Sequence, residues 1–576
     1  MQKKSSLLGS AAFGVLIAVG MSAVAPAADA AAKKHHKAHH AAAAAPGATA
    51  EEVHALTEQV QALTAKLQEQ AQATQALQAQ AQQAQTTAAE AQASARSAND
   101  QLRAQIDTIP GEVKTEIAAE KPKDGKAHYK GVTLTLGGFA AAEGVYRSKS
   151  ELADIGSSFA KIPYDSNILS HVSESRFTAR QSRLSLLAEG DINPQTHAAF
   201  YTEIDFLAGA QTGNSNESNS FSPRIRNVYG TMDWDNVDGM ANVHLLAGQN
   251  WSLATMNAKG ITPRSELSPP TIDAQYVVGF VWARQPQLRV AADFMDKQLW
   301  AAVSVENPAT TLASAATGTG TAVSGITANT GGTSLSQFDS ANTITFNHVP
   351  DVIAKIAYEP NLFGSRPLHM EVFGIYRDFY DRVYALAGNA AGLPVGDNNQ
   401  DTSSGGVGGG VTWTAIPKLL DVEASALTGR GIGRYGAGQL PDAVVGPDGR
   451  LKPLAESMFM GGATVHATSA LDLYFFAGEE HADRQSYTIG GKGFGYGSQL
   501  ASLAACTTEG GACAPDTQLI TQLAGGFWDK LYQGSYGSVR FGVQYSYTQL
   551  TAFTGVGGQP KTNDSMVFTS FRYYPF

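Results

Sequence analysis

Seven arginines stand in or beside stretches that alternate between apolar and polar residues, and their type and spacing point to anion binding. They are Arg180, Arg183, Arg224, Arg226, Arg284, Arg289 and Arg377. A guanidinium is always charged and offers several donors to carboxylate or phosphate oxygens. At mid-membrane an arginine facing lipid costs about 2–4 kcal/mol, so in a membrane protein these side chains should face a lumen or sit at its rims. The alternative is that some brace a wall by pairing with Glu189, Glu203 or Asp293.

The segment 252–275 carries charges of both signs between two alternating stretches. It contains Lys259, Arg264, Glu266 and Asp273. If this segment folds into a water-filled lumen, acidic and basic groups facing each other would impose a transverse field on polar solutes. We therefore predict that these four residues contribute to a constriction.

Motifs for covalent chemistry or cofactor binding do not provide a competing site. Residues 431–436 (GIGRYG) match GxGxxG, but nothing like a βαβ unit follows them, so a nucleotide site is not supported. The sequence shows no HExxH, no GxSxG and no visible arrangement of a nucleophile with a base. The sequence thus predicts no enzyme activity, no cofactor and no metal ligands.

Alternating strands are the elements that would carry these side chains, and residues 539–548 (VRFGVQYSYT) show the pattern most clearly. Val539, Phe541 and Val543 fall on one face, and Arg540 and Gln544 fall on the other. Ten residues of such alternation fit a strand that crosses a membrane between lipid and water. A surface strand of a soluble sandwich is the alternative for this stretch taken alone.

The connections between strands alternate in length, which favours a membrane barrel. Short turns are expected at 191–195, 235–239, 295–297, 416–418 and 468–470, and long polar loops near 147–176, 209–223, 252–276, 307–347, 378–406, 429–457 and 481–517. Short turns at one end and long loops at the other are typical of outer-membrane barrels. The fold class that we predict is an all-β transmembrane barrel of about 16 antiparallel strands over residues 131–576, preceded by an N-terminal α-helical coiled coil. Sixteen strands enclose an aqueous channel rather than a packed interior.

The strands expected between these connections can be placed along the chain. They run near 131–146, 177–190, 196–208, 224–234, 240–251, 286–294, 298–306, 351–359, 369–377, 407–415, 419–428, 458–467, 471–480, 518–528, 537–549 and 566–576.

Four further segments are expected before the barrel. Residues 1–30 have the charged start, apolar stretch and small-residue cleavage site of a secretory signal peptide. Residues 31–49 are a flexible Lys/His/Ala-rich segment, although the cluster AAKKHHKAHH at its start could also bind a metal, a cell-wall polymer or anionic lipid. Heptad spacing from Val53 to Ile109 predicts a periplasmic coiled coil over 50–110, with a single amphipathic or disordered segment as the alternative. Residues 111–130 form a linker.

The two cysteines and the overall charge add two expectations. Cys506 and Cys513 stand in the exported part of the chain, and a small disulfide loop is favoured over free thiols. Removing the signal peptide takes away Lys3, Lys4 and Asp29, so the net charge of −10 becomes −11. This acidic balance gives no support to nucleic-acid binding.

Several stretches carry a family resemblance. Residues 180–184 (RQSRL), with 189–191 (EGD) and 200–203 (FYTE), resemble the early strand pair of general Gram-negative porins. Residues 246–252 (LAGQNWS), 283–289 (ARQPQLR) and 431–435 (GIGRY) are similar to the DcaP-like family of trimeric outer-membrane porins. The end of the chain, 571–576 (FRYYPF), resembles the insertion signal of bacterial outer-membrane barrels, although Ser570 and Arg572 replace its usual apolar residues.

The resemblance implies a homotrimer of 16-stranded barrels in the outer membrane of a Gram-negative bacterium, with the N-terminal segment in the periplasm. Each barrel would let small hydrophilic solutes, often anions such as dicarboxylates, diffuse through its own pore. The alternative function is a structural tether, in which residues 31–110 would link the membrane to the cell wall. The expected partners are therefore other copies of the chain, outer-membrane lipid, small anionic solutes and, through 31–110, the cell wall.

Overall fold

The computed structural model describes the second of two compact units, Met1–Ala119 and Glu120–Phe576. The described residues are Ser97 and 126–209, 221–313, 321–323, 326–335, 342–360, 367–385 and 398–576. The predicted signal peptide, the Lys/His-rich segment, the coiled coil apart from Ser97, and residues 111–125 of the linker lie outside them. Within the described residues, no helix is long and apolar enough to span a membrane.

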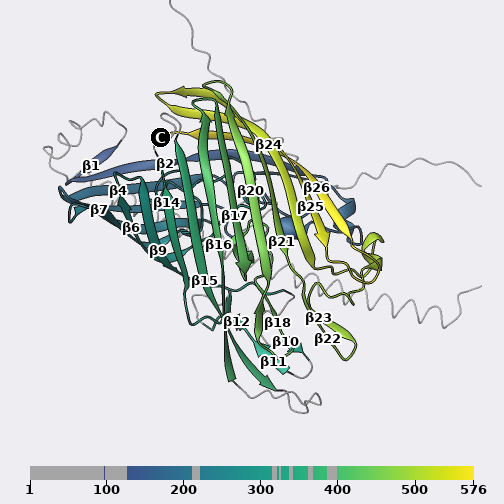
Figure 1. Cartoon of the computed structure of the whole chain (residues 1–576). Coiled ribbons are helices and arrows are strands. Elements are labelled where there is room, and N and C mark those ends of the chain that lie inside the picture. The colour runs from purple at the N-terminus through teal and green to yellow at the C-terminus, as the bar shows by residue number, and fades with distance from the viewer. Residues whose placement is uncertain are drawn as a thin grey trace, which may run out of the picture. The chain divides into compact units, whose positions relative to one another are not determined.

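A closed wall of 16 antiparallel strands forms this second unit, which confirms the barrel predicted from the sequence (Figure 1). In order around the wall these are β2 (Val132–Arg147), β4 (Arg183–Asn193), β5 (Thr196–Asp205), β6 (Arg224–Val237), β7 (Ala241–Trp251), β8 (Arg284–Phe294), β9 (Leu299–Glu306), β14 (Asp351–Tyr358), β15 (Leu368–Ala385), β16 (Asn398–Ile416), β17 (Leu420–Arg430), β20 (Ala455–His466), β21 (Leu471–Ala482), β24 (Thr517–Gly534), β25 (Gly537–Ala552) and β26 (Lys561–Tyr574). The last strand pairs with the first, from Ala140↔Tyr573 to Arg147↔Met566, so the wall has no open edge.

Shorter strands either pair with strands of this wall or lie within its connections. Two of them pair with β2: β1 (Ala127–Tyr129), which falls within the predicted linker, and β3 (Glu174–Thr178), which continues the line of β4. The others are β10 (Thr321–Val323), β11 (Ile326–Asn329), β12 (Gly331–Thr333), β13 (Thr343–Thr345), β18 (Ala443–Val445), β19 (Leu451–Pro453), β22 (Gln485–Ile489) and β23 (Lys492–Tyr496).

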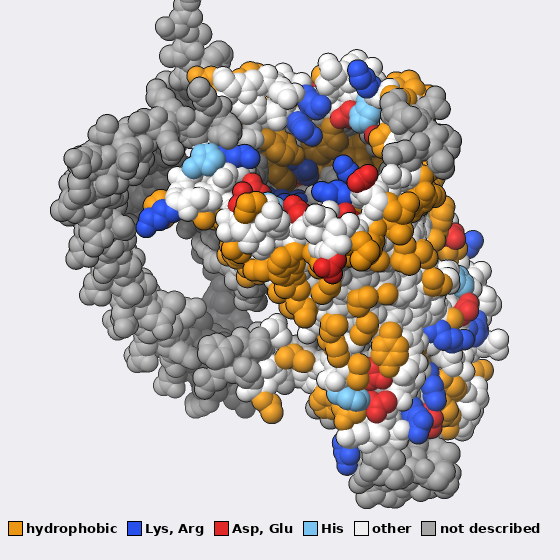
Figure 2. Space-filling view, turned by 60° about the vertical axis from the view of Figure 1, so that its left-hand side comes forward, with side chains coloured by type: hydrophobic (Ala, Val, Ile, Leu, Met, Phe, Trp, Pro, Cys, Tyr) orange, Lys and Arg blue, Asp and Glu red, His pale blue; other side chains and the backbone are white. Residues whose placement is uncertain are grey.

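The period-two pattern separates the two faces of the wall. In β8 the side chains of Gln287 and Arg289 are buried on the inner face, and those of Leu288 and Val290 are exposed on the outer face. Figure 2 shows hydrophobic side chains spread over the outside of the wall and charged side chains inside the opening above them. The outside of this barrel is therefore apolar and its inside polar.

The connections at the two ends of the barrel differ in length, as predicted. Six are tight at one end; for example, β8 ends at Phe294 and β9 begins at Leu299. The three central residues of that turn, Met295, Asp296 and Lys297, all have positive φ. We call this the short-turn end and the opposite one the long-loop end.

One predicted loop is largely wrong, because residues 378–406 lie mostly in strands. β15 and β16 continue as a paired ribbon from Arg377↔Ser404 to Val383↔Asn398. The Gly and Ser residues that suggested a loop are in β16, opposite an aromatic and β-branched stretch of β15 that favours a strand. Pairing with β15 therefore overrides the low β-strand propensity of the Gly and Ser residues in β16.

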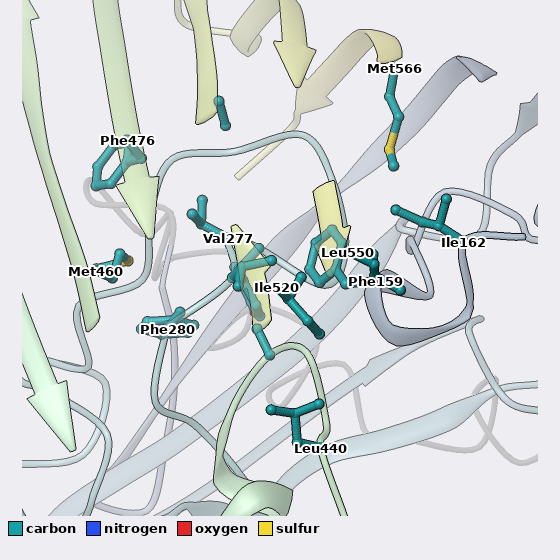
Figure 3. Close-up of a cluster of buried hydrophobic side chains, with 14 of the residues drawn as sticks. Phe159, Ile162, Val277, Phe280, Leu440, Met460, Phe476, Ile520, Leu550 and Met566 are labelled. Atoms are coloured by element: carbon teal, nitrogen blue, oxygen red, sulfur yellow. The ribbon is translucent and has the colours of Figure 1, made fainter. Parts of the chain in front are cut away.

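A hydrophobic core fills the inside of the barrel near the long-loop end (Figure 3). Phe159 comes from the β2–β3 connection, Val277 and Phe280 from the β7–β8 connection, and Leu440 from the β17–β20 connection. They pack against inward-facing side chains of the wall, among them Met460, Phe476, Ile520, Leu550 and Met566. The long connections thus fold into the lumen.

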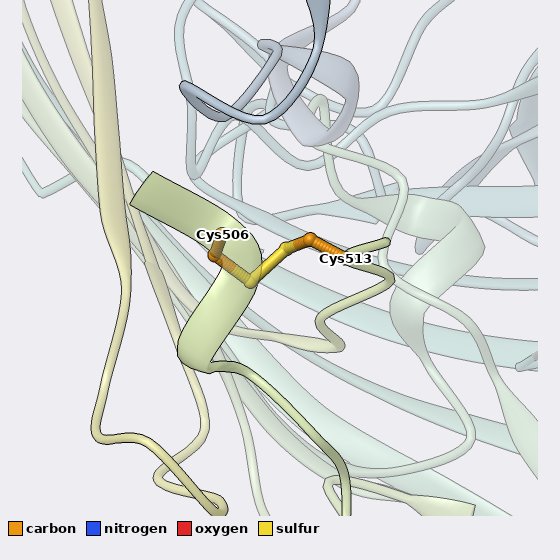
Figure 4. The surroundings of a disulfide bond; sticks show 2 residues. All are labelled: Cys506 and Cys513. Atoms are coloured by element: carbon orange, nitrogen blue, oxygen red, sulfur yellow. A yellow bond between two sulfur atoms is a disulfide. The ribbon is translucent and has the colours of Figure 1, made fainter. Parts of the chain in front are cut away.

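Cys506 and Cys513 are joined by a disulfide in the β23–β24 connection (Figure 4). Cys506 is in the short 3-10 helix Ala504–Thr507, and the two Cα atoms are 4.9 Å apart. Its loop contacts the β2–β3 connection, because Ser166 N donates to Cys506 O at 3.0 Å. The disulfide therefore fixes one long loop where it meets another.

Two glycines allow the β7–β8 connection to lie directly on the wall, and one of them gives a test of this packing. Gly279 has a φ of +85°, and a Cβ at Gly478 would be 1.9 Å from Val278 O. The substitution Gly478→Ala should therefore lower the free energy of unfolding by about 1–3 kcal/mol through overpacking. Thermal unfolding in detergent checks this. Gly230→Ala is the control, because the added Cβ would meet its nearest atom, Ala199 O, only at 3.8 Å; equal stability of the two variants would contradict the prediction.

Candidate pore and constriction

The connection between β7 and β8, residues 252–283, crosses the inside of the barrel and is held there by side chains of the wall. Leu253 N donates to Glu306 Oε1 at 2.8 Å and Asn257 N to Glu371 Oε2 at 3.1 Å. Every backbone N–H that leaves water needs an acceptor. The polar inner face of the strands supplies these acceptors, so polar residues that alternation places inside do not all face water.

Three further acceptors hold the second half of this segment. Ile272 N donates to Gln544 Oε1 at 2.6 Å, Val278 N to Gln522 Oε1 at 3.0 Å and Gly279 N to Glu480 Oε1 at 2.8 Å. From the sequence, Gln544 was expected to face water; instead its side chain is fully buried beneath the segment. The wall strands β21, β24 and β25 thus position the segment.

Between this segment and the wall, toward the short-turn end, lies a cavity of about 560 Å³. Residues 267–274 form one side of it, and strands from both ends of the chain form the rest. Tyr474 and Trp528 contribute aromatic surface, and Trp528 Nε1 donates to Pro270 O at 2.7 Å. A solute in this part of the lumen would have charged side chains around it.

Four arginines line one arc of this cavity. Arg183 comes from β4, Arg226 from β6, Arg540 from β25 and Arg572 from β26. Closure of the barrel brings the last two strands beside the first ones, which is why residues more than 300 positions apart share one surface. We call these four residues the arginine arc.

The four arginines differ in how far protein carboxylates neutralise them. Arg226 pairs with Glu203 and with Asp205, the latter at 3.0 Å, and Arg572 Nη2 lies 2.8 Å from Glu143 Oε1. Arg183 has only a 4.0 Å contact with Glu203.

The fourth arginine, Arg540, has no ion pair among those found in the described part of the chain. Its guanidinium stands over the ring of Tyr574 at 5.1 Å. The Nε atoms of Arg183 and Arg540 are buried without a hydrogen-bond partner. Among the ion pairs of the described residues, protein carboxylates thus leave these two guanidinium groups largely uncompensated.

Acidic residues line another arc of the same cavity. Asp421 and Glu423 come from β17 and Asp472 from β21. His466 of β20 bridges two of them, with Nε2 at 3.1 Å from Asp421 Oδ2 and Nδ1 at 2.7 Å from Asp472 Oδ1. We call Asp421, Glu423 and Asp472 the acidic arc. A polar solute in the cavity would lie in the field between the two arcs.

The seven arginines predicted as pore-lining fall into three groups. Arg183 and Arg226 line the cavity. Arg284 lies against Trp251, a lining residue, and against Trp282, with its guanidinium 5.0 and 5.1 Å from their ring centres. Its Nη1 is buried without a hydrogen-bond partner. Arg284 thus adds positive charge close behind the surface of the cavity.

The other four predicted arginines brace the structure. Arg180 pairs with Asp154 and Arg224 with Asp205. Arg289 is buried in the wall and donates to Gln287 Oε1 and Trp251 O. Arg377 is fully buried and bonded to Asp442 at 2.8 Å and to backbone oxygens.

Of the four predicted constriction residues, only Asp273 lines the cavity. It accepts from Ser157 N at 3.1 Å and Gln275 N at 2.9 Å. Burial raises the pKa of this carboxyl, which lies in the connection between β7 and β8.

The other three constriction residues are placed away from the cavity. Arg264 stacks on Tyr201 at 5.6 Å, Glu266 accepts from Asn250 Nδ2 at 3.1 Å, and Lys259 is exposed.

Sequence reasoning did not include Arg540, Arg572 or the acidic arc among the site residues. The alternation of 539–548 already placed Arg540 on a polar face, and Arg572 interrupts an otherwise aromatic C-terminal strand. Those two signals could have identified them. No comparable signal marks Asp421, Glu423 and Asp472, because acidic residues are common near turns.

Comparison with solved structures shows what the fold is similar to. The fold is similar to the outer membrane channel DcaP of Acinetobacter baumannii, with a TM-score of 0.52 and 17% identity over 77% of this chain and 99% of that chain. Two other solved structures are less similar. OmpF of Salmonella typhi has a TM-score of 0.40 and 10% identity over 78% of this chain and 100% of that chain. OprB of Pseudomonas putida has a TM-score of 0.40 and 11% identity over 76% of this chain and 94% of that chain. No family model and no curated protein sequence matches the chain.

These observations define the class of protein by its fold: a closed 16-stranded antiparallel β-barrel with a connection folded into its lumen. Within that class, the fold is similar to that of DcaP, which confirms at the level of fold the resemblance seen in the sequence.

The anchor at Gln544 gives a test of how the segment is held. Gln544→Leu removes the acceptor of Ile272 N and leaves a buried donor unpaired, which costs about 1–3 kcal/mol. We expect the segment to loosen and the single-channel conductance of the reconstituted protein to rise or fluctuate. Gln559→Leu is the matched control, because Gln559 is exposed and its side chain donates to that of Gln518 near the surface. Steady wild-type conductance in Gln544→Leu would rule out this anchoring role.

Proposed function

We propose that the protein is an outer-membrane porin through which small hydrophilic, anionic solutes of the dicarboxylate type diffuse passively. The observation that carries this proposal is the arginine arc on a lumen cavity of about 560 Å³. The apolar outer face and the DcaP-like fold support the membrane location. The protein does no covalent chemistry in this function.

Selectivity would come from the width of the cavity and the charges around it. An anion entering the lumen is attracted by the guanidinium groups of Arg183 and Arg540, which protein carboxylates leave largely uncompensated. A second carboxylate on the same solute could reach Arg572 or Arg226. The acidic arc repels the solute from the other part of the wall and so orients it. Local lining outweighs the net charge of −11 expected for the mature chain, because screening limits distant charges.

The assembly that we propose is a homotrimer with the N-terminal segment in the periplasm. An even number of strands places the two ends of the barrel domain on the same side, which in outer-membrane barrels is the side of the short turns. A three-stranded coil formed by 50–110 would match the symmetry of a trimer, although heptads alone do not fix the number of strands.

Reversal potentials across a planar bilayer under a salt gradient test the charge selectivity. We expect the wild type to prefer anions. In the double variant Arg183→Gln/Arg540→Gln the anion-to-cation ratio should fall by at least about fivefold, because even one charge at 4 Å in water is worth about 1 kcal/mol. Arg450→Gln, in an exposed loop, is the control and should leave the ratio unchanged. A wild type that prefers cations would disprove the proposal.

A tether to the cell wall is the second function that we propose to test. The heptads from Val53 to Ile109 and the basic, His-rich residues 31–40 favour it. Deletion of 31–110 behind an intact signal peptide should abolish sedimentation with purified cell wall and leave single-channel conductance unchanged. If the variant that lacks residues 31–110 still sediments with the cell wall, a tether function of these residues is excluded.

A further inference from the structure

Where the β15–β16 ribbon begins, just beyond Arg377↔Ser404, three side chains of metal-binding type meet on one face. Asp378 is on β15 and Asp401 is on β16. Asp378 pairs in register with Ser403, so Asp401 is its diagonal neighbour on the same face of the ribbon. His348 approaches them from the connection that precedes β14. None of these residues takes part in the candidate pore.

The ligand atoms of the three residues are close enough to share one ion. His348 Nδ1 lies 3.1 Å from Asp401 Oδ1 and 3.9 Å from Asp378 Oδ1, and the three atoms are all within 4.8 Å of one another. In a tetrahedral site with bonds of about 2.0–2.1 Å, neighbouring ligand atoms are about 3.4 Å apart. Small rotations of the side chains would therefore complete the geometry.

The charges of this group are not balanced by the protein. Two carboxylates face a single imidazole, and no Lys or Arg ion pair to either carboxylate is found in the described parts of the chain. Asp378 is only 6% exposed, and its Oδ1 is buried without a hydrogen-bond partner while directed toward His348. A buried carboxylate oxygen without a donor is costly, and a cation would satisfy it.

The imidazole is also held in an orientation that suits a ligand. The ring of Tyr380 packs edge-on against His348, with ring centres 4.4 Å apart. This packing limits rotation of the imidazole ring. The side chains of His348 and Asp401 are 48% and 52% exposed, so an ion and water ligands can reach the site.

We propose that His348, Asp378 and Asp401 bind a divalent transition-metal ion of the Zn²⁺ type. One imidazole and two carboxylates suit such ions, whereas Ca²⁺ takes six to eight oxygen ligands. The ion would join the connection before β14 to two adjacent strands at the long-loop end. Its expected effect is to raise the thermal stability of that end of the barrel and to leave the pore unchanged.

Titration of the full mature chain with Zn²⁺ by calorimetry tests the site. His35, His36, His39 and His40 are replaced by Ala in every variant, because they could bind the ion themselves. We expect one site per chain, weakened by at least about tenfold in His348→Gln and in Asp378→Asn. His481→Gln is the matched control. His481 Nδ1 lies 3.8 Å from Asp483 Oδ1, also at the long-loop end of the barrel. In the described part of the chain, these two residues belong to no group of three metal-binding side chains.

A second measurement keeps the test independent of folding. Co²⁺ in place of Zn²⁺ gives visible absorption bands that are strong in a four-coordinate site and weak for the hydrated ion, and they should fall to the level of the hydrated ion in His348→Gln while the variant still migrates as a folded barrel on a gel. The proposal is overturned if the wild type shows no site, or if His348→Gln binds like His481→Gln. Neither result depends on whether the protein conducts anions.

Discussion

The inward segment 252–283 can exist only if its backbone polar groups find partners inside the barrel, and the rest of the structure depends on this constraint. A loop taken out of water must replace the hydrogen bonds that water gave it. Glu306, Glu371, Glu480, Gln522 and Gln544 provide acceptors from five different strands. Each stands on the inner face of its strand because alternation puts it there. The wall thus sets the path of the loop, and the loop sets the limits of the cavity.

The arginines show why charge on an inner wall does not by itself indicate function. Arg377 is as inward-facing as Arg183, but it is fully buried and bonded to Asp442, so no solute can meet it. Arg183 lines the cavity with one distant carboxylate. The difference comes from which connection folds over each side chain. An arginine that is buried and paired with a carboxylate fixes the wall around it. An arginine that borders a cavity without a close carboxylate would instead attract an anionic solute.

Much of the fold could be predicted from the sequence, because the number of strands and the length of the turns depend on local patterns. Less of the site could be predicted. Arg572 meets Arg183 only because the barrel closes, and Lys259 and Arg264 miss the cavity only because of the path that the loop takes. Both are long-range effects of register and packing, which period-two alternation does not encode. The same limit explains the extended β16, whose Gly- and Ser-rich stretch is held in a strand by its neighbour β15.

Filling part of a wide barrel with its own loops ties selectivity to stability. A wall of 16 strands alone would leave an aqueous channel with little preference among small solutes. Here the connections bring an apolar core into the lumen, where Phe280 and Val277 pack on Phe476 and Ile520. That core takes up part of the lumen and leaves the cavity beside the arginine arc, and Coulomb interactions are strong at short range. In the proposed function, residues that never touch a solute would therefore help to determine what passes, and a change in packing at Gly478 would act on the same structure as a change of charge at Arg540.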